Sequence, residues 1–392
     1  MFVIRFITLT VLVSLFACTS NEEQKELSIS KSKESSLGLP VESSKHDRTA
    51  KNVILMIGDG MGLAQITAAM EAREQPLELE LFKVIGLAKT GSAIESITDS
   101  AASATAIATG VKTRNGVVGI DKDGIKQETI LEFLGNKGYA TGIIATSTIT
   151  HATPASFYAH EFSRNNYYQI AAQMKAAPLD LFIGGGRSHF VDRTDKKNGK
   201  TDQRNIREEM AQDGFVFVDS LKDIQGTTDR VGYFIADIHP EPVLKGRGNV
   251  LPASIPVAIS HLQSRSDQGF FLVVEGAQID WGGHANDDDY MISELYDFDA
   301  AVGNALDFSI ADGNTLLIVT ADHETGGLSL SAEPERENEL TSYKSHVHDF
   351  TTNGHTAVMV PVFAFGPGSE RFSGTYENTA IHDKMLRALK NK

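Results

Sequence analysis

The sequence predicts an α/β protein with a largely parallel central sheet and helices on both faces of that sheet. Short and almost wholly apolar runs, each of the length of a strand, recur along the chain. Strands that are buried on both faces have this composition. Between the runs lie stretches whose apolar residues are three and four positions apart, which is the spacing of a helix with one buried face. Alternation of the two patterns is typical of parallel strands that helices connect.

Six apolar runs are predicted to be strands. The first reads N-V-I-L-M-I over residues 52–57 and is followed by Gly58, Asp59 and Gly60. An apolar run that ends at glycine has the profile of a buried parallel strand. The other five runs are residues 140–146, 179–183, 270–274, 315–320 and 360–365.

Three stretches are predicted to be helices. Residues 129–137 place apolar side chains on one face, and Gly138 favours an end to the helix. Residues 290–308 repeat apolar side chains at helical spacing. The small residues 101–109 indicate a short buried helix that begins at Ser100.

The composition is that of a well-packed globular protein with an acidic surface. Of 392 residues, 41% are hydrophobic, and the formal net charge is −15. We expect no nucleic-acid-binding surface, because phosphate backbones attract lysine and arginine. A phosphate-bearing substrate would then need local positive charge, which metal cations can supply.

Residues 1–17 have the form of a signal peptide. Arg5 precedes an apolar run that is too short to span a membrane as a mature helix. The run ends L-F-A-C, which resembles a bacterial lipoprotein signal, so Cys18 would become the acylated first residue. We expect an exported protein that is lipid-anchored in the cell envelope or periplasm; ordinary secretion and a cytosolic location are the alternatives. Cys18 is the only cysteine, which excludes an intramolecular disulfide.

Residues 18–50 predict a flexible tether, because they are rich in serine, lysine and glutamate and can bury little surface. One folded catalytic domain is expected over residues 51–392. Within it, residues 185–250 carry no motif that indicates a role.

Acidic residues and histidines follow three of the predicted strands. Asp59, Glu275 and the pair Asp322-His323 each come one or two residues after an apolar run. In open α/β sheets ligands bind at the carboxyl ends of strands, so we expect these side chains to converge. Carboxylates and imidazoles are zinc ligands, and catalytic zinc sites keep one position open.

Single features of this set also have ordinary structural explanations. The glycines at 184–186 favour a tight turn over a phosphate cradle. The acidic residues 287–289 favour the start of a helix over a cation site. His346 and His348 are interpreted as surface residues of a charged loop rather than as metal ligands. Trp281 is interpreted as a residue at the rim of the site, with core packing as the alternative.

Taken together, six motifs in one order resemble the alkaline phosphatase family. They are I-G-D-G at 57–60, D-S-A at 99–101, H-E-F-S-R at 160–164, E-G-A-Q-I-D-W-G-G-H at 275–284, A-D-H-E-T at 321–325 and N-G-H-T at 353–356. The resemblance implies an enzyme that hydrolyses small phosphomonoesters. It also implies that residues 332–350 form a rim loop or a reduced version of the family's crown insertion.

The resemblance implies three metal sites, two for zinc ions and one for magnesium. The first zinc ion would be bound by Asp280, His284 and His355. The second would be bound by Asp59, Asp322 and His323, and would also contact the nucleophile, Ser100. The magnesium ion would be bound by Asp59, Thr153 and Glu275.

Four further positions are assigned by the resemblance or by their neighbours. Arg164 matches the arginine that binds the substrate phosphate, and Asp99 is expected to orient it. His151 and Trp281 resemble the branch of the family that includes cold-active bacterial members. Their identity affects the third metal site and water-mediated contacts to phosphate.

The chemistry of Ser100 supports the same reaction. A helix N-terminus offers unpaired N–H groups and a dipole that favours anions. An alcohol needs a base or a metal to become a nucleophile, and the G-x-S-x-G esterase elbow is absent. We therefore expect activation by zinc and a two-step displacement through phosphoserine.

Other functions stay open. A phosphodiesterase or phosphonate hydrolase could use the same two metals, whereas the C/S-x-P-x-R motif of a sulfatase is absent. A zinc-storing lipoprotein without activity would have no use for Ser100 and Arg164. A homodimer is considered by analogy with the family.

Overall fold

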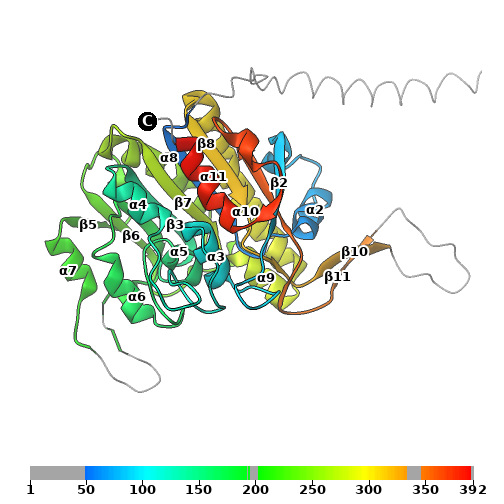
Figure 1. Ribbon diagram of the computed structural model, residues 1–392, viewed down its shortest axis with the longest axis horizontal. Helices are drawn as coiled ribbons and strands as arrows, with labels where there is room; N and C mark the ends of the chain where they lie inside the picture. Colours follow the sequence, from blue (N-terminus) through cyan, green and yellow to red (C-terminus); the bar gives the residue numbers. More distant parts are fainter. Residues whose placement is uncertain (1–48, 192, 195–201, 333–345, 390–392) are drawn as a thin grey trace, which may run out of the picture. The chain divides into compact units, whose positions relative to one another are not determined.

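The computed structural model describes residues 49–191, 193–194, 202–332 and 346–389. The signal peptide, Cys18 and nearly all of the tether therefore lie outside the described residues. The described chain is built on a ten-stranded sheet with the strand order β14-β2-β13-β8-β1-β7-β3-β4-β6-β5 (Figure 1). No helix within the described ranges is long and apolar enough to cross a membrane.

The strands of the large sheet are mostly parallel, which confirms the predicted fold class. They are β1 (Asn52–Gly58), β2 (Val84–Lys89), β3 (Ala140–Thr148), β4 (Leu181–Gly185), β5 (Phe215–Val218), β6 (Arg230–Ala236), β7 (Phe270–Gly276), β8 (Thr315–Thr320), β13 (Val360–Phe365) and β14 (Gly374–Glu377). Only β13 runs antiparallel to its neighbours, β8 and β2. The six predicted runs are all strands in this sheet.

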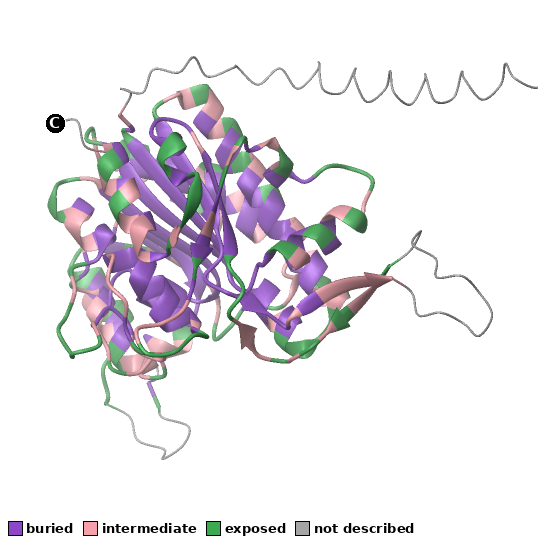
Figure 2. Ribbon diagram, turned by 45° about the vertical axis from the view of Figure 1, so that its right-hand side comes forward, coloured by how far each residue is buried: buried purple, intermediate pink, exposed green. Residues whose placement is uncertain are grey.

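The centre of the sheet is buried on both faces. Every residue of β1, β3, β7 and β8 is buried, and Figure 2 shows these strands in purple between the helices. Covering both faces explains why these strands read as continuous apolar runs rather than as alternating ones.

Helices cover the sheet in two groups (Figure 1). The first group is α2 (Leu63–Glu71), α8 (Val250–Arg265), α9 (Gln278–Ala285) and α10 (Asp288–Asp312). The second group is α3 (Ser100–Thr109), α4 (Ile130–Asn136), α5 (Ala152–Ala155) and α11 (Thr379–Leu389). Two further helices, α6 (Tyr167–Met174) and α7 (Ile206–Gln212), lie near β4 and β5 in the sequence.

The predicted helix starts have a visible cause. Asp287 caps α10 by accepting a hydrogen bond from the Tyr290 N–H at 2.9 Å, as the acidic residues 287–289 predict. Thr129 and Glu132 form a capping box at the start of α4. The helix that begins at Ser100 is present as α3 and ends at Gly110 in the left-handed conformation.

Two sequence interpretations need correction. Gly184 and Gly185 belong to β4, and only Gly186, with φ of 100°, makes the predicted turn. The stretch 185–250, for which no role is predicted, supplies the edge strand β5 and its neighbour β6. His346 and His348 lie not in a loop but in β11 (His346–Phe350), which pairs antiparallel with β10 (Leu328–Ala332). The residues between these two strands are outside the described part, so the crown remains a prediction.

Candidate active site

The three acidic residues predicted to converge lie together at the carboxyl ends of the central strands β1, β7 and β8. Strand β1 is the parallel neighbour of both β7 and β8. Ile57 is in register with Glu275 on one side and with Thr320 on the other. Asp59 and Asp322 follow these positions directly, so the register of three strands brings the carboxylates together.

The first cluster contains Asp59, Asp322 and His323, all fully buried. His323 Nε2 lies 3.4 Å from Asp59 Oδ1 and 3.2 Å from Asp322 Oδ2. The same nitrogen lies 3.3 Å from the hydroxyl oxygen of Ser100. This is the set predicted for the second zinc ion, and its geometry suits one metal ion.

The second cluster contains Asp280, His284 and His355. Asp280 and His284 share one face of α9 at a spacing of four residues, with His284 Nε2 3.4 Å from Asp280 Oδ2. Strand β12 (His355–Thr356) pairs with β9 (Glu324–Thr325) and brings His355 Nε2 to 3.6 Å from Asp280 Oδ1. His355 Nε2 and His284 Nε2 lie 3.2 Å apart. The set predicted for the first zinc ion is therefore assembled.

The two clusters touch each other through their histidines. The rings of His323 and His355 stack with centroids 3.5 Å apart. Asp280, His323 and His355 also lie close enough to one another to hold an ion. The two clusters therefore form one continuous group of candidate metal ligands.

The third cluster contains Glu275, Asp59 and His151, which lie close enough together to hold an ion. Glu275 Oε2 accepts a hydrogen bond from the Ser147 hydroxyl at 2.7 Å. Thr153 is also fully buried, and its hydroxyl has no hydrogen-bond partner among the described residues. His151 thus lies with residues predicted to bind magnesium, whereas the resemblance implies only that its identity affects that site.

Unpaired oxygens show that these side chains suit cations. Among the described residues, a set of buried side-chain oxygens in the clusters has no hydrogen-bond partner: Asp59 Oδ1, Asp59 Oδ2, Thr153 Oγ1, Glu275 Oε1 and Asp322 Oδ2. Buried oxygen atoms without partners are unfavourable unless a ligand binds them. Hard and borderline divalent cations bind this combination of oxygen and imidazole ligands.

The electrostatics of the clusters lead to the same conclusion. Burial, together with the charges of Asp322, Asp280 and Glu275, raises the pKa of Asp59 well above its usual value. Burial raises the pKa of Glu275 to about 7. A hydrogen bond to Asp280 raises the pKa of His284 to about 9. Like charges confined without solvent need positive charge, which bound cations would provide.

Ser100 lies at the N-terminus of α3, next to the cluster of Asp59, Asp322 and His323. It is the first residue of α3 and is buried, with a relative exposure of 2%. Asp99 caps the helix by accepting a hydrogen bond from the Ala102 N–H at 2.9 Å. The free N–H groups of the first turn favour an anion beside the Ser100 hydroxyl.

Arg164 lies beside the cap of α3. Its Nη1 donates to Asp99 Oδ2 at 3.0 Å, so the expected contact is present. Its Nη2 lies 3.3 Å from His151 Nε2. Burial opposes the charge of Arg164, but Asp99 outweighs this effect and raises the pKa of the guanidinium. Asp99 therefore holds the positively charged guanidinium of Arg164 close to the candidate metal ligands.

Aromatic rings line the rim. Trp281 is half-buried, as predicted for a rim residue, and lies edge-on to His239 with ring centroids 4.8 Å apart. His239 also lies edge-on to His151 at 5.8 Å. No sequence motif predicts His239 as a site residue, since it comes from the stretch after β6 that has none. The signal that identifies it is its hydrogen bond from the Thr148 N–H at the end of β3.

Known proteins share this sequence and fold. A family model described as alkaline phosphatase matches residues 50–335. Alkaline phosphatase 3 of Bacillus subtilis (strain 168) is 33% identical over 424 residues, which cover 86% of this chain and 89% of the relative. The chain belongs to the alkaline phosphatase family. It is therefore an enzyme of the alkaline phosphatase class, as the sequence motifs predict.

Solved alkaline phosphatase structures have the same architecture. The alkaline phosphatase from the Antarctic bacterium TAB5 is 43% identical, with a TM-score of 0.81 over 87% of this chain and 99% of that one. A mutant of the TAB5 alkaline phosphatase, 42% identical and with the same TM-score over 87% and 98% of the two chains, has magnesium bound in its M3 site.

Proposed function

We propose that this enzyme hydrolyses phosphate monoesters through a phosphoserine on Ser100, with two zinc ions and one magnesium ion. The observation that carries the proposal is the position of the Ser100 hydroxyl. It lies 3.3 Å from His323, at the buried Asp59–Asp322 cluster, and at the N-terminus of the helix whose cap contacts Arg164. A nucleophile, an anion-binding helix end and a guanidinium therefore face the same place.

The ligands of the two zinc ions follow from the clusters. Asp280, His284 and His355 would bind one ion, and Asp59, Asp322 and His323 would bind the other. Asp59, Glu275 and Thr153 offer the oxygen-rich third site to magnesium, which prefers such ligands. When bound, the ions lower the pKa of a coordinated hydroxyl or water and neutralise charge that develops on phosphate oxygens.

The residues of the chain then carry out two displacements. The Ser100 hydroxyl gives its proton to solvent and its oxygen attacks phosphorus to form a phosphoserine bond. The bond from phosphorus to the ester oxygen breaks, and that oxygen takes a proton from water and leaves as the alcohol. Water next attacks the phosphoserine, which releases inorganic phosphate and restores the serine hydroxyl. Arg164 presents two parallel N–H groups to the non-bridging oxygens, and Asp99 keeps this fork in place. The N-terminus of α3 stabilises the negative charge during both steps.

One assay tests the function. Protein without residues 1–18 is stripped with a chelator and assayed on a chromogenic phosphate monoester and on its diester at alkaline pH. We expect zinc and magnesium to restore monoesterase activity, and Ser100→Ala to abolish nearly all of it. A preference for the diester would instead assign a phosphodiesterase, and activity that does not depend on Ser100 would remove the phosphoserine step.

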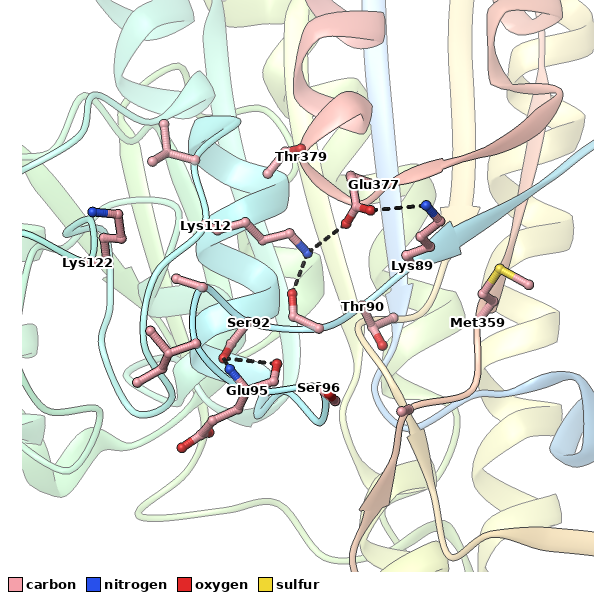
Figure 3. A pocket seen from close by; sticks show the side chains of 15 residues that line it. Lys89, Thr90, Ser92, Glu95, Ser96, Lys112, Lys122, Met359, Glu377 and Thr379 are labelled. Carbon is pink, nitrogen blue, oxygen red and sulfur yellow. Dashed lines mark hydrogen bonds and ion pairs between the residues drawn. The ribbon is translucent and has the colours of Figure 1, made fainter.

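We propose that a second copy of the chain covers the face beside the active site. An open cavity of about 1010 Å³ lies there, with Ile94 and Met359 in its lining (Figure 3). Ile94 and Met359 expose 63% and 37% of their surface. Neighbouring exposed apolar side chains mark interaction surfaces. Sedimentation should show a dimer that Ile94→Asp dissociates, and a monomeric wild-type protein would refute the pairing.

We also propose export and lipid anchoring through Cys18, on the strength of the L-F-A-C signal pattern. Labelling with a radioactive fatty acid in a bacterial host should mark the wild-type protein and not Cys18→Ala. Equal labelling of both proteins, or of neither, would contradict the anchor.

A further inference from the structure

Thr325 is a buried residue that joins the two proposed zinc-ligand sets. It belongs to the A-D-H-E-T motif, where the sequence analysis gives it no role. Its Oγ1 lies 2.5 Å from Asp280 Oδ1 and 3.1 Å from His323 Nδ1. Asp280 belongs to the first set and His323 to the second, so one hydroxyl contacts a ligand of each ion.

The number of available hydrogens determines the direction of the two hydrogen bonds that Thr325 makes with Asp280 and His323. A hydroxyl has one hydrogen to donate, and an ionised carboxylate oxygen can only accept. Thr325 therefore donates to Asp280 and accepts a hydrogen bond from His323. The hydrogen of the His323 ring is then on Nδ1, which leaves the lone pair of Nε2 free.

That lone pair is directed at the candidate metal position. His323 Nε2 lies 3.2 Å from Asp322 Oδ2, 3.4 Å from Asp59 Oδ1 and 3.3 Å from Ser100 Oγ. A neutral imidazole binds metal through the nitrogen without hydrogen, and the partner of the other nitrogen determines which one that is.

Two glycines fix the conformation of Thr325. A Cβ atom at Gly60 would lie 2.8 Å from Thr325 Oγ1, and one at Gly283 would lie 3.0 Å from Thr325 Cγ2. The hydroxyl and the methyl group thus each fill space that a glycine leaves open. The backbone contributes as well, since the Thr325 N–H donates to the Gly60 carbonyl at 3.3 Å. The side chain has little freedom to turn its hydroxyl away from the two ligands.

We propose that Thr325 is a positioning residue whose single hydroxyl orients Asp280 and His323 and so couples the binding of the two zinc ions. The inference rests on the proposed function, because it takes both side chains to be zinc ligands. Residues that hydrogen-bond to metal ligands commonly change metal affinity or activity by 10- to 100-fold when removed.

Zinc binding to the metal-free protein tests the proposal without relying on activity. Thr325→Val keeps the shape of the side chain and removes the hydroxyl, and Thr325→Ser keeps the hydroxyl. Thr141→Val is the matched control, because that buried hydroxyl donates to the Pro178 carbonyl, away from the clusters. Zinc affinity is measured against a competing chelator, and nitrogen NMR of His323 reports which ring nitrogen carries the hydrogen.

We expect Thr325→Val to weaken the binding of both ions by about 10- to 100-fold. Its His323 ring should lose the preference for hydrogen on Nδ1. Thr325→Ser and Thr141→Val should bind zinc as the wild type does. If the valine variant does not fold, Thr325→Ser and Thr325→Ala give the same comparison, since both lack the methyl group and differ in the hydroxyl alone.

Each of the other possible results would refute one part of the proposal. Wild-type affinity in Thr325→Val would refute the positioning role, and a loss confined to one ion would refute the coupling. A wild-type protein that binds no zinc would refute the proposed function and, with it, the inference.

Discussion

Asp59 shows what the site requires of a single residue. It is fully buried, and within the described ranges neither of its carboxylate oxygens has a hydrogen-bond partner. A buried ion without a partner costs several kcal/mol, whereas the same ion beside a cation is stabilised. The residue therefore destabilises the protein without metal and stabilises it with metal.

The effect of replacing Asp59 on protein stability should change sign when metal ions are bound. We expect metal-free Asp59→Asn to be more stable than metal-free wild type by about 1–3 kcal/mol, because burial of this carboxyl group and its repulsion from the neighbouring carboxylates are relieved. With zinc and magnesium present, the variant should be the less stable of the two. Thermal unfolding with and without chelator measures both comparisons, and a variant that is destabilised under both conditions would contradict this account.

Arg164 should contribute to the binding of phosphate rather than to the stability of the fold. Arg164→Ala removes two hydrogen bonds to a charged group, each worth about 1.5–3 kcal/mol, so kcat/KM should fall on the order of 10²- to 10⁴-fold. Inhibition by inorganic phosphate should weaken in parallel. Arg164→Lys keeps the charge and loses the fork, so it should recover only part of the activity. Full activity in the lysine variant would show that the fork is not needed.

His160 and Glu132 give stability a pH dependence away from the metal clusters. His160 Nε2 lies 2.9 Å from Glu132 Oε1, and its Nδ1 lies 2.7 Å from the Gly119 carbonyl. Burial opposes the charge on both side chains, but these hydrogen bonds outweigh it: the pKa of His160 is raised and that of Glu132 is lowered. Because the folded protein holds the His160 proton more tightly, this stabilisation is complete below the unfolded pKa of about 6.5 and is lost as pH rises through the folded pKa.

His160→Gln should therefore lower the stability of the fold most at mildly acidic pH. We expect it to lower the free energy of unfolding by roughly 1–2 kcal/mol more at pH 5.5 than at pH 8.5, as measured by urea denaturation. The contribution of Glu132 also stabilises the fold, but its pH dependence is opposite: it is complete above the unfolded pKa and is lost as pH falls through the lowered folded pKa. In a Glu132→Gln background the difference between the two pH values should shrink, and an unchanged difference would mean that another group causes it.

At the scale of elements, α9 depends on its close contact with α10. A Cβ atom at Gly282 would lie 2.5 Å from the Met291 backbone nitrogen, and the same helix carries Asp280 and His284. The two helices can approach this closely only because position 282 has no side chain. Asp280 and His284 are thus held in place by packing as well as by sequence spacing.

Gly282→Ala should separate the two helices. We expect a loss of about 1–3 kcal/mol in the free energy of unfolding, together with weaker zinc binding. Gly303→Ala in α10 is the matched control, because its new Cβ would meet the flexible Glu78 side chain instead of backbone. That variant should be neutral or stabilised by up to about 1 kcal/mol, since alanine favours the helix. Equal effects of the two substitutions would argue against the close contact.

At the scale of the whole molecule, the ends of parallel strands and several loops meet in one acidic pocket. Asp59, Glu275 and Asp322 come from three neighbouring strands, and His355 comes from a short strand pair beside them. Bound cations would therefore link segments from almost the whole length of the chain. Metal binding is then part of the stability of the fold.

Chelation should lower the melting temperature of the entire protein. An ion present at about 1,000 times its Kd contributes about 4 kcal/mol, which corresponds to a decrease on the order of 10 °C in a protein of this size. Scanning calorimetry before and after removal of zinc and magnesium measures the difference. Restoring the ions should restore the melting temperature, and an unchanged value would mean that the clusters are stable without cations.

The sequence by itself determined the class of fold, the strands of the sheet centre and the acidic residues and histidines that gather at the candidate site. These features are local, because an apolar run records burial on both faces, and motif spacing such as Asp280 to His284 records one helical turn. The tertiary structure alone decided the antiparallel direction of β13, the pairing of β10 with β11, and the places of His239 and Thr325. Each of these depends on which distant segments come together. No residue's neighbours in sequence encode the contact of Thr325 with Asp280, since packing of β9 against α9 creates it.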